Sequence, residues 1–379
     1  MRVAILGVGL IGGSIGLAAR ARAGAEVCGY DPDERACATA LELGALDSAA
    51  ADLRGAVAGA DVVFAAAPVG ALARTVTLAL ECAGADCVVS DVGSTKRMLA
   101  QAARDERFIG GHPLAGAETA GVEHAREDLF DGATWYLTPA KGRSAGVLYE
   151  RLHRLLGRLG ARPVAVDAEV HDRIMACVSH LPHVLANVLV DQAAGVLDPL
   201  EATPGSDGGQ EDGQDGGGEL RRLPAVGPSF RDATRVAGAN SSIWTDIYLA
   251  NRDAMLGEIE ELERRLGAVR GWLLAGDAAA LGAWNARARV ARDALLGRGL
   301  TGGETHDVRE LHVSVPNRPG VIAEIALALG DAGVNILDLV LSPAPDNRQG
   351  VVALWFAGEQ QRARAGELIT ALGFPVVRA

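Results

Sequence analysis

A run of closely spaced glycines near the start constrains the fold of this chain more than any other feature. Residues 3–16 read VAILGVGLIGGSIG, so an apolar segment leads directly into Gly7, Gly9 and Gly12. The apolar residues predict a strand at Arg2–Leu6, and the residues after Gly9 predict a helix. A strand that passes through Gly-x-Gly-x-x-Gly into a helix is typical of domains that bind a dinucleotide.

The residue types in this segment indicate how a dinucleotide would be held. Gly7 permits a tight turn, Gly9 lets the backbone approach a pyrophosphate, and Gly12 lets the helix pack closely on the strand. The unpaired N–H groups at the start of the helix attract phosphate. We therefore expect the cofactor-binding residues to be Gly7, Gly9, Leu10, Ile11, Gly12, Asp31 and Pro68.

Asp31 ends the second predicted strand, roughly twenty residues after the glycines, where dinucleotide-binding domains carry an acidic residue. A carboxylate there accepts hydrogen bonds from ribose hydroxyls and repels a 2′-phosphate, which favours NAD over NADP. Arg35 lies close by and leaves NADP as an alternative. The alternative is a glycine-rich turn that binds no ligand.

The first half of the chain alternates short apolar runs with helical segments, which predicts an α/β domain of the Rossmann type at residues 1–167. Because the runs are apolar throughout, we expect a parallel sheet covered on both faces. The predicted strands are Arg2–Leu6, Glu26–Tyr30, Asp61–Ala66, Cys87–Asp91, Phe108–Gly110, Thr134–Leu137 and Pro163–Val166.

The second half predicts two further domains. Residues 168–299 form an all-helical domain whose apolar faces suggest a homodimer, and the segment 201–219 inside it is too polar and glycine-rich to fold. After a linker at Leu300–Asp307, residues 308–379 have a ferredoxin-like order of strands and helices. The predicted helices of the second domain are Ala168–Leu197, Ser229–Ala237, Ser242–Arg270 and Ala278–Leu296.

Charge and cysteine content exclude some classes of protein. The 379 residues carry a net charge of −12, which argues against a nucleic-acid surface. No stretch of about 18 apolar residues is free of charge, so we expect no membrane span. The five cysteines are odd in number and lack metal-ligand spacing, which favours free thiols in a reducing cytoplasm; they are Cys28, Cys37, Cys82, Cys87 and Cys177.

Two polar clusters follow strands of the first domain and should lie at the ligand-binding edge of the sheet. The first, SDVGSTK, places Ser94 where it could cap a helix or bind a substrate hydroxyl. The second, GGHPLAGAE, contains His112, whose imidazole could accept a proton near neutral pH or could be structural.

A third cluster comes from the helical domain. His171 and Asp172 begin its first helix, and His180 and His183 share one face further along. We expect no metal there, because no third ligand has convincing spacing. Arg235 is a candidate for binding a carboxylate, with a surface salt bridge as the alternative.

Seven segments, in this order, resemble the prephenate/arogenate dehydrogenase family, and the resemblance covers nearly the whole chain. They are GVGLIGGS, DVGSTK, GGHPLAGAETAG, DLFDGATWYLTP, VHDRIMACVSHLPH, SFRDATRVA and SIWTDIYLANR. The final seventy residues look like an ACT domain, through VPNRPG and GVNI. The chain departs from the family's usual pattern at Ala117 and before Phe230.

The resemblance implies roles for the polar residues in an oxidation coupled to loss of carbon dioxide. His112 would draw the proton from the ring hydroxyl of the substrate, Ser94 would orient that hydroxyl, and Arg235 would hold a carboxylate. Other substrate-site residues implied in this way are His183, Glu118, Asp172 and Trp244.

The implied activity is an NAD-dependent prephenate dehydrogenase that makes 4-hydroxyphenylpyruvate for tyrosine biosynthesis, with arogenate as the alternative substrate. The ACT-like domain would bind an amino acid, most simply tyrosine as a feedback inhibitor. The residues expected to contribute to that regulatory site are Asn317, Gly320 and Asn335.

Two other functions remain to be weighed. A β-hydroxyacid dehydrogenase joins a similar nucleotide domain to a helical domain, but it uses a catalytic lysine there, and this chain has no lysine after Lys141. A sensor of nucleotide and amino acid without catalysis is the alternative from another class, and it predicts that His112 is dispensable.

Overall fold

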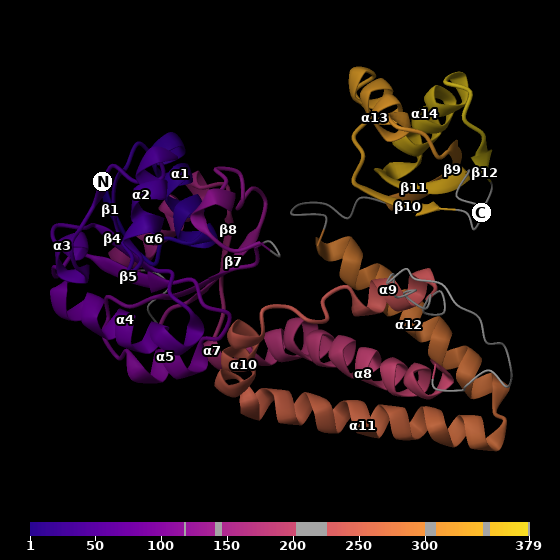
Figure 1. Cartoon of the computed structure of the whole chain (residues 1–379), viewed down its shortest axis with the longest axis horizontal. Helices are drawn as coiled ribbons and strands as arrows, with labels where there is room; N and C mark the ends of the chain where they lie inside the picture. The colour runs from indigo at the N-terminus through magenta and orange to yellow at the C-terminus, as the bar shows by residue number, and fades with distance from the viewer. Residues whose placement is uncertain (117–118, 141–145, 202–225, 300–307, 344–348, 378–379) are drawn as a thin grey trace, which may run out of the picture. The chain divides into compact units, whose positions relative to one another are not determined.

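The computed structural model describes residues 1–116, 119–140, 146–201, 226–299, 308–343 and 349–377 (Figure 1). The chain divides into two compact units, Met1–Glu263 and Arg264–Ala379. Glu118, nearly all of the expected insert at 201–219 and the expected linker at Leu300–Asp307 lie outside the described residues.

A five-stranded parallel sheet with the order β3-β2-β1-β4-β5 forms the centre of the first unit. Leu6 pairs with Tyr30 and with Ala65, and Ala65 pairs with Asp91. This register brings the glycine turn, Asp31 and Asp91 out at one edge of the sheet. The strands are β1 (Arg2–Leu6), β2 (Glu26–Tyr30), β3 (Ser48–Ala49), β4 (Val62–Ala65) and β5 (Val88–Asp91).

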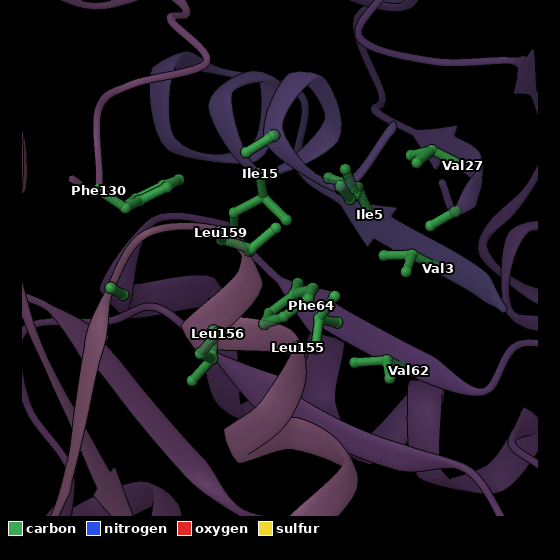
Figure 2. Packing of buried hydrophobic residues seen from close by; sticks show 14 of the residues in the cluster. Val3, Ile5, Ile15, Val27, Val62, Phe64, Phe130, Leu155, Leu156 and Leu159 are labelled. Carbon is green, nitrogen blue, oxygen red and sulfur yellow. The ribbon is translucent and has the colours of Figure 1, made fainter. Parts of the chain in front are cut away.

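Helices cover both faces of this sheet because successive strand residues point to opposite sides. Ile5 packs with Ile15, Phe64 and Leu155 on one face (Figure 2), whereas Leu6 belongs to a separate apolar cluster on the other. Full burial of each large apolar side chain contributes about 1.5–3 kcal/mol. The helices are α1 (Leu10–Ala23), α2 (Glu34–Glu42), α3 (Leu53–Val57), α4 (Val69–Cys82), α5 (Arg97–Ala102) and α6 (Val147–Arg158).

The expectation of one fully parallel sheet is wrong for the later strands. β6 (Gly110–Pro113), β7 (Thr134–Thr138) and β8 (Arg162–Ala165) form a second sheet, in which β6 and β7 are antiparallel. A parallel bridge between Val89 and Phe108 joins the start of this segment to β5. His112 therefore lies inside a strand, two residues beyond the predicted end at Gly110.

The helical part of the first unit begins with one long stretch that changes its winding. α7 (Ala168–Met175) passes through a π-helical turn at Ala176–His180 into α8 (Leu181–Glu201). Two shorter helices follow, α9 (Pro228–Thr234) and α10 (Ser241–Ala250).

The single helix predicted at Ser242–Arg270 is wrong, because the chain breaks between α10 and α11 (Arg252–Ala275). The break is at Asn251, with φ −110° and ψ 24°, and its side chain is fully buried. Its amide bonds to groups on the α7–α8 stretch, and these bonds hold the non-helical backbone in place.

The second unit contains α12 (Ala278–Gly299) and a ferredoxin-like fold. Its antiparallel sheet has the order β10-β11-β9-β12, and the second strand begins at Asp338 rather than at Val334 as predicted. The elements are β9 (Val308–Pro316), α13 (Val321–Asp331), β10 (Asp338–Pro343), β11 (Gln349–Ala357), α14 (Gly358–Ala371) and β12 (Val376–Val377).

Candidate active site

The three glycines of the turn after β1 have different surroundings. Gly7 has φ +105°, and a Cβ there would lie 2.6 Å from the carbonyl carbon of Ala66. A Cβ on Gly12 would lie 2.0 Å from the carbonyl oxygen of Gly7, whereas a Cβ on Gly9 would meet nothing within 4 Å. Gly7 and Gly12 are thus required by close packing, and Gly9 borders open space at the start of α1, where a phosphate group could approach.

Asp31 lies directly beside this turn. Its Oδ2 accepts a hydrogen bond of 2.7 Å from the backbone N–H of Val8, and its Oδ1 accepts one of 2.9 Å from that of Asp33. The carboxylate is only partly buried, so its remaining lone pairs can accept from a ribose hydroxyl. Among the other expected cofactor residues, Leu10 is buried at the start of α1, Ile11 is half-buried and Pro68 is exposed.

A chain of hydrogen bonds fixes the ring of His112. His112 Nδ1 lies 2.9 Å from His171 Nε2, and His171 Nδ1 lies 2.8 Å from Asp172 Oδ1. An ionised carboxylate can only accept, so we assign the proton of His171 to Nδ1, which leaves its Nε2 as an acceptor. His112 must then donate through Nδ1, so its Nε2 carries no proton and has the lone pair that a base requires.

Asp172 also joins the helical part to the nucleotide part. Its Oδ1 accepts from the backbone N–H of Lys96 at 2.7 Å, and its Oδ2 accepts from that of Arg97 at 2.9 Å. These groups form the N-terminus of α5, which has no capping side chain of its own. The interpretation of Ser94 as a helix cap is therefore wrong, because the helix starts at Arg97; Ser94 lies half-buried in the preceding loop.

His180 and His183 both contact Trp244. The rings of His180 and Trp244 are nearly perpendicular, with their centroids 6.0 Å apart. The ring of His183 stacks on that of Trp244, with centroids 3.5 Å apart. Asn251 Nδ2 donates to His180 Nδ1 at 3.1 Å and to the carbonyl of Asp172 at 2.7 Å. In the described part of the chain, no group of three or more His, Cys, Asp or Glu side chains could hold a metal ion.

Burial lowers the pKa of three histidines of this site, His112, His180 and His183. It lowers the pKa of His112 well below the ordinary value, and the nearby His171, Lys96 and His180 lower it further. Burial also lowers the pKa of His180 to about 4 and lowers that of His183, to which the positive charge of Arg235 adds. The His112 imidazole is partly exposed to solvent and is unprotonated near neutral pH, which suits a proton acceptor.

Three family descriptions match successive parts of the chain. The nucleotide-binding domain of prephenate dehydrogenase matches residues 15–165, its dimerisation domain matches residues 167–203 and 211–285, and the ACT domain matches residues 309–362. A prephenate dehydrogenase of Bacillus subtilis (strain 168) is 31% identical over 381 residues, which cover 97% of this chain and 95% of that protein.

This chain belongs to the prephenate dehydrogenase family. Among solved structures, a prephenate dehydrogenase from A. aeolicus in complex with hydroxyphenyl propionate and NAD+ is 28% identical, with a TM-score of 0.66. The alignment covers 98% of that protein and 78% of this chain. An arogenate dehydrogenase from Synechocystis is 25% identical, with a TM-score of 0.64, covering 78% of this chain and 100% of that one.

Several residues that shape this prephenate dehydrogenase site were not singled out from the sequence as site residues. Asp91 and Lys96 form a buried ion pair behind the Ser94 loop, and Asn251 bridges Asp172 and His180. Asp246, two residues after Trp244, accepts a hydrogen bond of 3.2 Å from the backbone N–H of Gly70 in the first turn of α4. A polar residue at a strand end or a helix break is a signal for such roles, but the partner is not visible in the sequence.

The expected regulatory residues are not gathered in one place by the fold of a single copy. Asn317 and Gly320 precede α13, and Asn335 follows it, so they lie at opposite ends of a helix about 16 Å long. All three are exposed, and Gly320 has φ +86°, a conformation that favours glycine.

The lowered pKa of His180 predicts that the protein loses stability as the pH falls. His180 is protonated near pH 4 in the folded protein, whereas an unfolded histidine is protonated near about pH 6.5. The contribution of His180 to the free energy of unfolding is therefore complete above about pH 6.5 and is lost as the pH falls toward 4. We expect His180 alone to lower the melting temperature by about 4–8 °C between pH 7.5 and pH 5.

Thermal unfolding at both pH values checks this expectation. His180→Asn should show a smaller pH-dependent drop than the wild type, whereas His124→Asn, at an exposed histidine, should show the same drop as the wild type. An equal drop in His180→Asn and wild type would contradict the argument.

Proposed function

We propose that this chain is an NAD-dependent prephenate dehydrogenase of tyrosine biosynthesis, which converts prephenate to 4-hydroxyphenylpyruvate and carbon dioxide. The observation that carries the proposal is the hydrogen-bonded chain from Asp172 through His171 to His112, which leaves one imidazole nitrogen of His112 unprotonated and able to act as a base. The full-length likeness to a relative of that name supports the same substrate.

The residues around the glycine turn fit the proposed cofactor. The space beside Gly9 and the N-terminus of α1 would receive the pyrophosphate, and Asp31 would accept from the ribose hydroxyls. Bound NAD would supply the acceptor for the hydride that leaves the hydroxyl-bearing ring carbon. A 2′-phosphate would be repelled by the Asp31 carboxylate, which favours NAD over NADP.

In the proposed reaction, His112 moves one proton twice. Its Nε2 accepts the proton of the ring hydroxyl while the carbon–oxygen double bond forms and the hydride leaves. The carbon–carbon bond to the ring carboxylate then breaks, and its electron pair makes the ring aromatic as carbon dioxide departs. The phenolate oxygen takes the proton back from His112, so the base is neutral again.

The positioning roles fall to residues of both parts of the first unit. Ser94, two residues before the backbone amide that Asp172 holds, would orient the ring hydroxyl. Arg235 would bind a substrate carboxylate through its guanidinium group, and its charge is already felt by His183. The stacked pair of His183 and Trp244 would form one wall of the substrate pocket.

Arogenate is the second candidate substrate. It differs from prephenate only in an amino group in place of the side-chain keto group, and a solved arogenate dehydrogenase shares the fold of this chain. The ring chemistry and the work of His112 would be the same with either substrate.

The proposal predicts NADH formation from prephenate and a separation of two mutant effects. His112→Asn should lower kcat by about 100-fold or more because the proton acceptor is lost, while NAD binding persists. Arg235→Gln should chiefly raise KM for prephenate. Steady-state NADH formation with prephenate and with arogenate, each with NAD and NADP, measures these effects; no NADH from either substrate would refute the activity.

We further propose a soluble, cytoplasmic homodimer with domains at 1–167, 168–299 and 308–379. In the described residues, one helical stretch, Ala168–Gly195, is long and apolar enough to cross a membrane. It carries the buried His171, Asp172 and His180 with their hydrogen-bond partners, which fits a folded core better than lipid. The matching dimerisation domain supports a homodimer. A second copy of the chain would also cover the exposed apolar side chains of α11 and α12, among them Leu266, Leu273, Leu274, Trp284 and Leu295.

Sedimentation equilibrium tests this assembly. We expect a particle of twice the chain mass, because exposed leucines and a tryptophan along two helices are costly to leave in water. A particle of the mass of one chain at micromolar concentration would contradict the dimer.

The ACT domain supports regulation by an amino acid, and we propose that tyrosine inhibits the enzyme through it. Asn317→Ala and Asn335→Ala should each raise the tyrosine concentration needed for half-inhibition by at least about fivefold, with kcat unchanged when tyrosine is absent. Initial rates across a tyrosine titration measure this shift. A full-length enzyme that tyrosine does not inhibit would discard the feedback proposal.

A further inference from the structure

Asp91 and Lys96 form a fully buried ion pair beside the candidate active site. Asp91 ends β5, and Lys96 immediately precedes α5; both side chains have 0% exposure, and Lys96 Nζ bonds to Asp91 Oδ2. Burying two charges costs several kcal/mol for each ion, which is offset only where further hydrogen bonds complete the arrangement. The contacts of this pair should therefore reveal what it does.

The two oxygens of Asp91 hold two different segments, the loop after β5 and strand β6. Oδ2 accepts a hydrogen bond of 2.8 Å from the backbone N–H of Gly93, and Oδ1 accepts one of 3.0 Å from that of Gly111. Gly93 directly precedes Ser94, and Gly111 directly precedes His112. One carboxylate thus fastens the backbone immediately before each of the two residues proposed to act on the ring hydroxyl.

Glycines are required where the backbone passes close to the ion pair. A Cβ on Gly93 would lie 3.0 Å from Asp91 Oδ2 and 2.4 Å from Leu72 Cδ1, and a Cβ on Gly111 would lie 2.5 Å from the carbonyl oxygen of Asp91. A Cβ on Gly110 would lie 3.2 Å from Lys96 Cδ. The glycines allow the loop after β5 and strand β6 to approach the ion pair closely enough for direct hydrogen bonds.

Lys96 supplies the positive charge that lies against the buried Asp91 carboxylate, whose two oxygens accept from the backbone amides of Gly93 and Gly111. Burial lowers the pKa of Lys96, and the adjacent Asp91 opposes that change. The backbone N–H of Lys96 also donates to Asp172, which holds His171 against the His112 ring. The main chain of His112 is thus fixed through Asp91, and its side chain is fixed through Asp172.

We propose that Asp91 is a positioning residue that sets the separation of Ser94 and His112, with Lys96 as its counter-ion. This inference rests on the proposed function, because it concerns the alignment of those two groups on one substrate hydroxyl. It explains why the chain buries a lysine and an aspartate that take no part in the proton transfer. Misplacement of a catalytic group by about 1 Å can cost about 100-fold in rate.

The double variant Asp91→Asn/Lys96→Met tests the proposal without burying an unpaired charge. The asparagine side chain has one oxygen and can accept from only one of the two backbone amides, that of Gly93 or that of Gly111, at the native geometry. We expect kcat to fall by about 10–100-fold, with KM for NAD changed by less than about threefold, because the glycine turn is untouched. Hydrogen exchange measured on peptides containing Gly93 and Gly111 should become faster.

Asp91→Glu is the second variant, because it keeps a carboxylate as partner for Lys96 but adds a methylene group at a fully buried site. It should lower kcat in the same way. Phe130→Leu, at a fully buried residue of the same unit, is the matched control: it should lower the melting temperature with kcat and glycine exchange unchanged.

The outcomes separate the two levels of the argument. Either Asp91 variant, if folded and within twofold of wild-type kcat, would overturn the positioning role. Wild-type hydrogen-exchange rates at Gly93 and Gly111 in both variants would overturn it as well. A wild type that forms no NADH from prephenate or arogenate would instead refute the proposed function, whatever the exchange experiment gives.

Discussion

The structure of the active site depends on the carboxylate of Asp172 more than on any other group. It caps the N-terminus of α5, orients His171 and lies beside the carbonyl that Asn251 holds. A buried carboxylate is tolerated only when donors fill its lone pairs, and here the donors come from both the nucleotide part and the helical part. Asp246 does the same at α4 through Gly70, so two helix N-termini of the nucleotide part are closed by acids from the helical part.

Local pattern was sufficient to predict the core of the nucleotide part. β1 and β2 have the predicted bounds because uninterrupted apolar residues alternate between two buried faces, and the turn chemistry of Gly7 allows little else. The second sheet was not predicted, because the segment 108–113 is short and glycine-rich. Its hydrophobic pattern does not distinguish parallel from antiparallel pairing. The break at Asn251 was missed for a related reason: its cause is a hydrogen bond to residues 71 and 79 positions away.

In the candidate site, too, the sequence indicated which residue types matter but not which partners they bond to. The sequence pointed to His112 as a base because of its chemistry and its position after a strand. Which nitrogen is free could not be predicted, because that depends on His171, 59 residues away. Asp91 was visible only as a polar residue at a strand end, and its importance comes from two backbone amides, those of Gly93 and Gly111, that donate to its two oxygens.

The π-helical turn at Ala176–His180 has a geometric consequence for the rings of His171 and His180. In a regular α-helix, the nine steps from position 171 to position 180 would sum to about 900°, which places the two rings on opposite faces. A π-turn holds one residue more than an α-turn and so reduces this angle to about 80°, turning both rings toward the same side. The pocket therefore depends on the winding of this segment as well as on its composition: the same residues wound as a regular α-helix would keep every chemical group and still point His180 away from its partners.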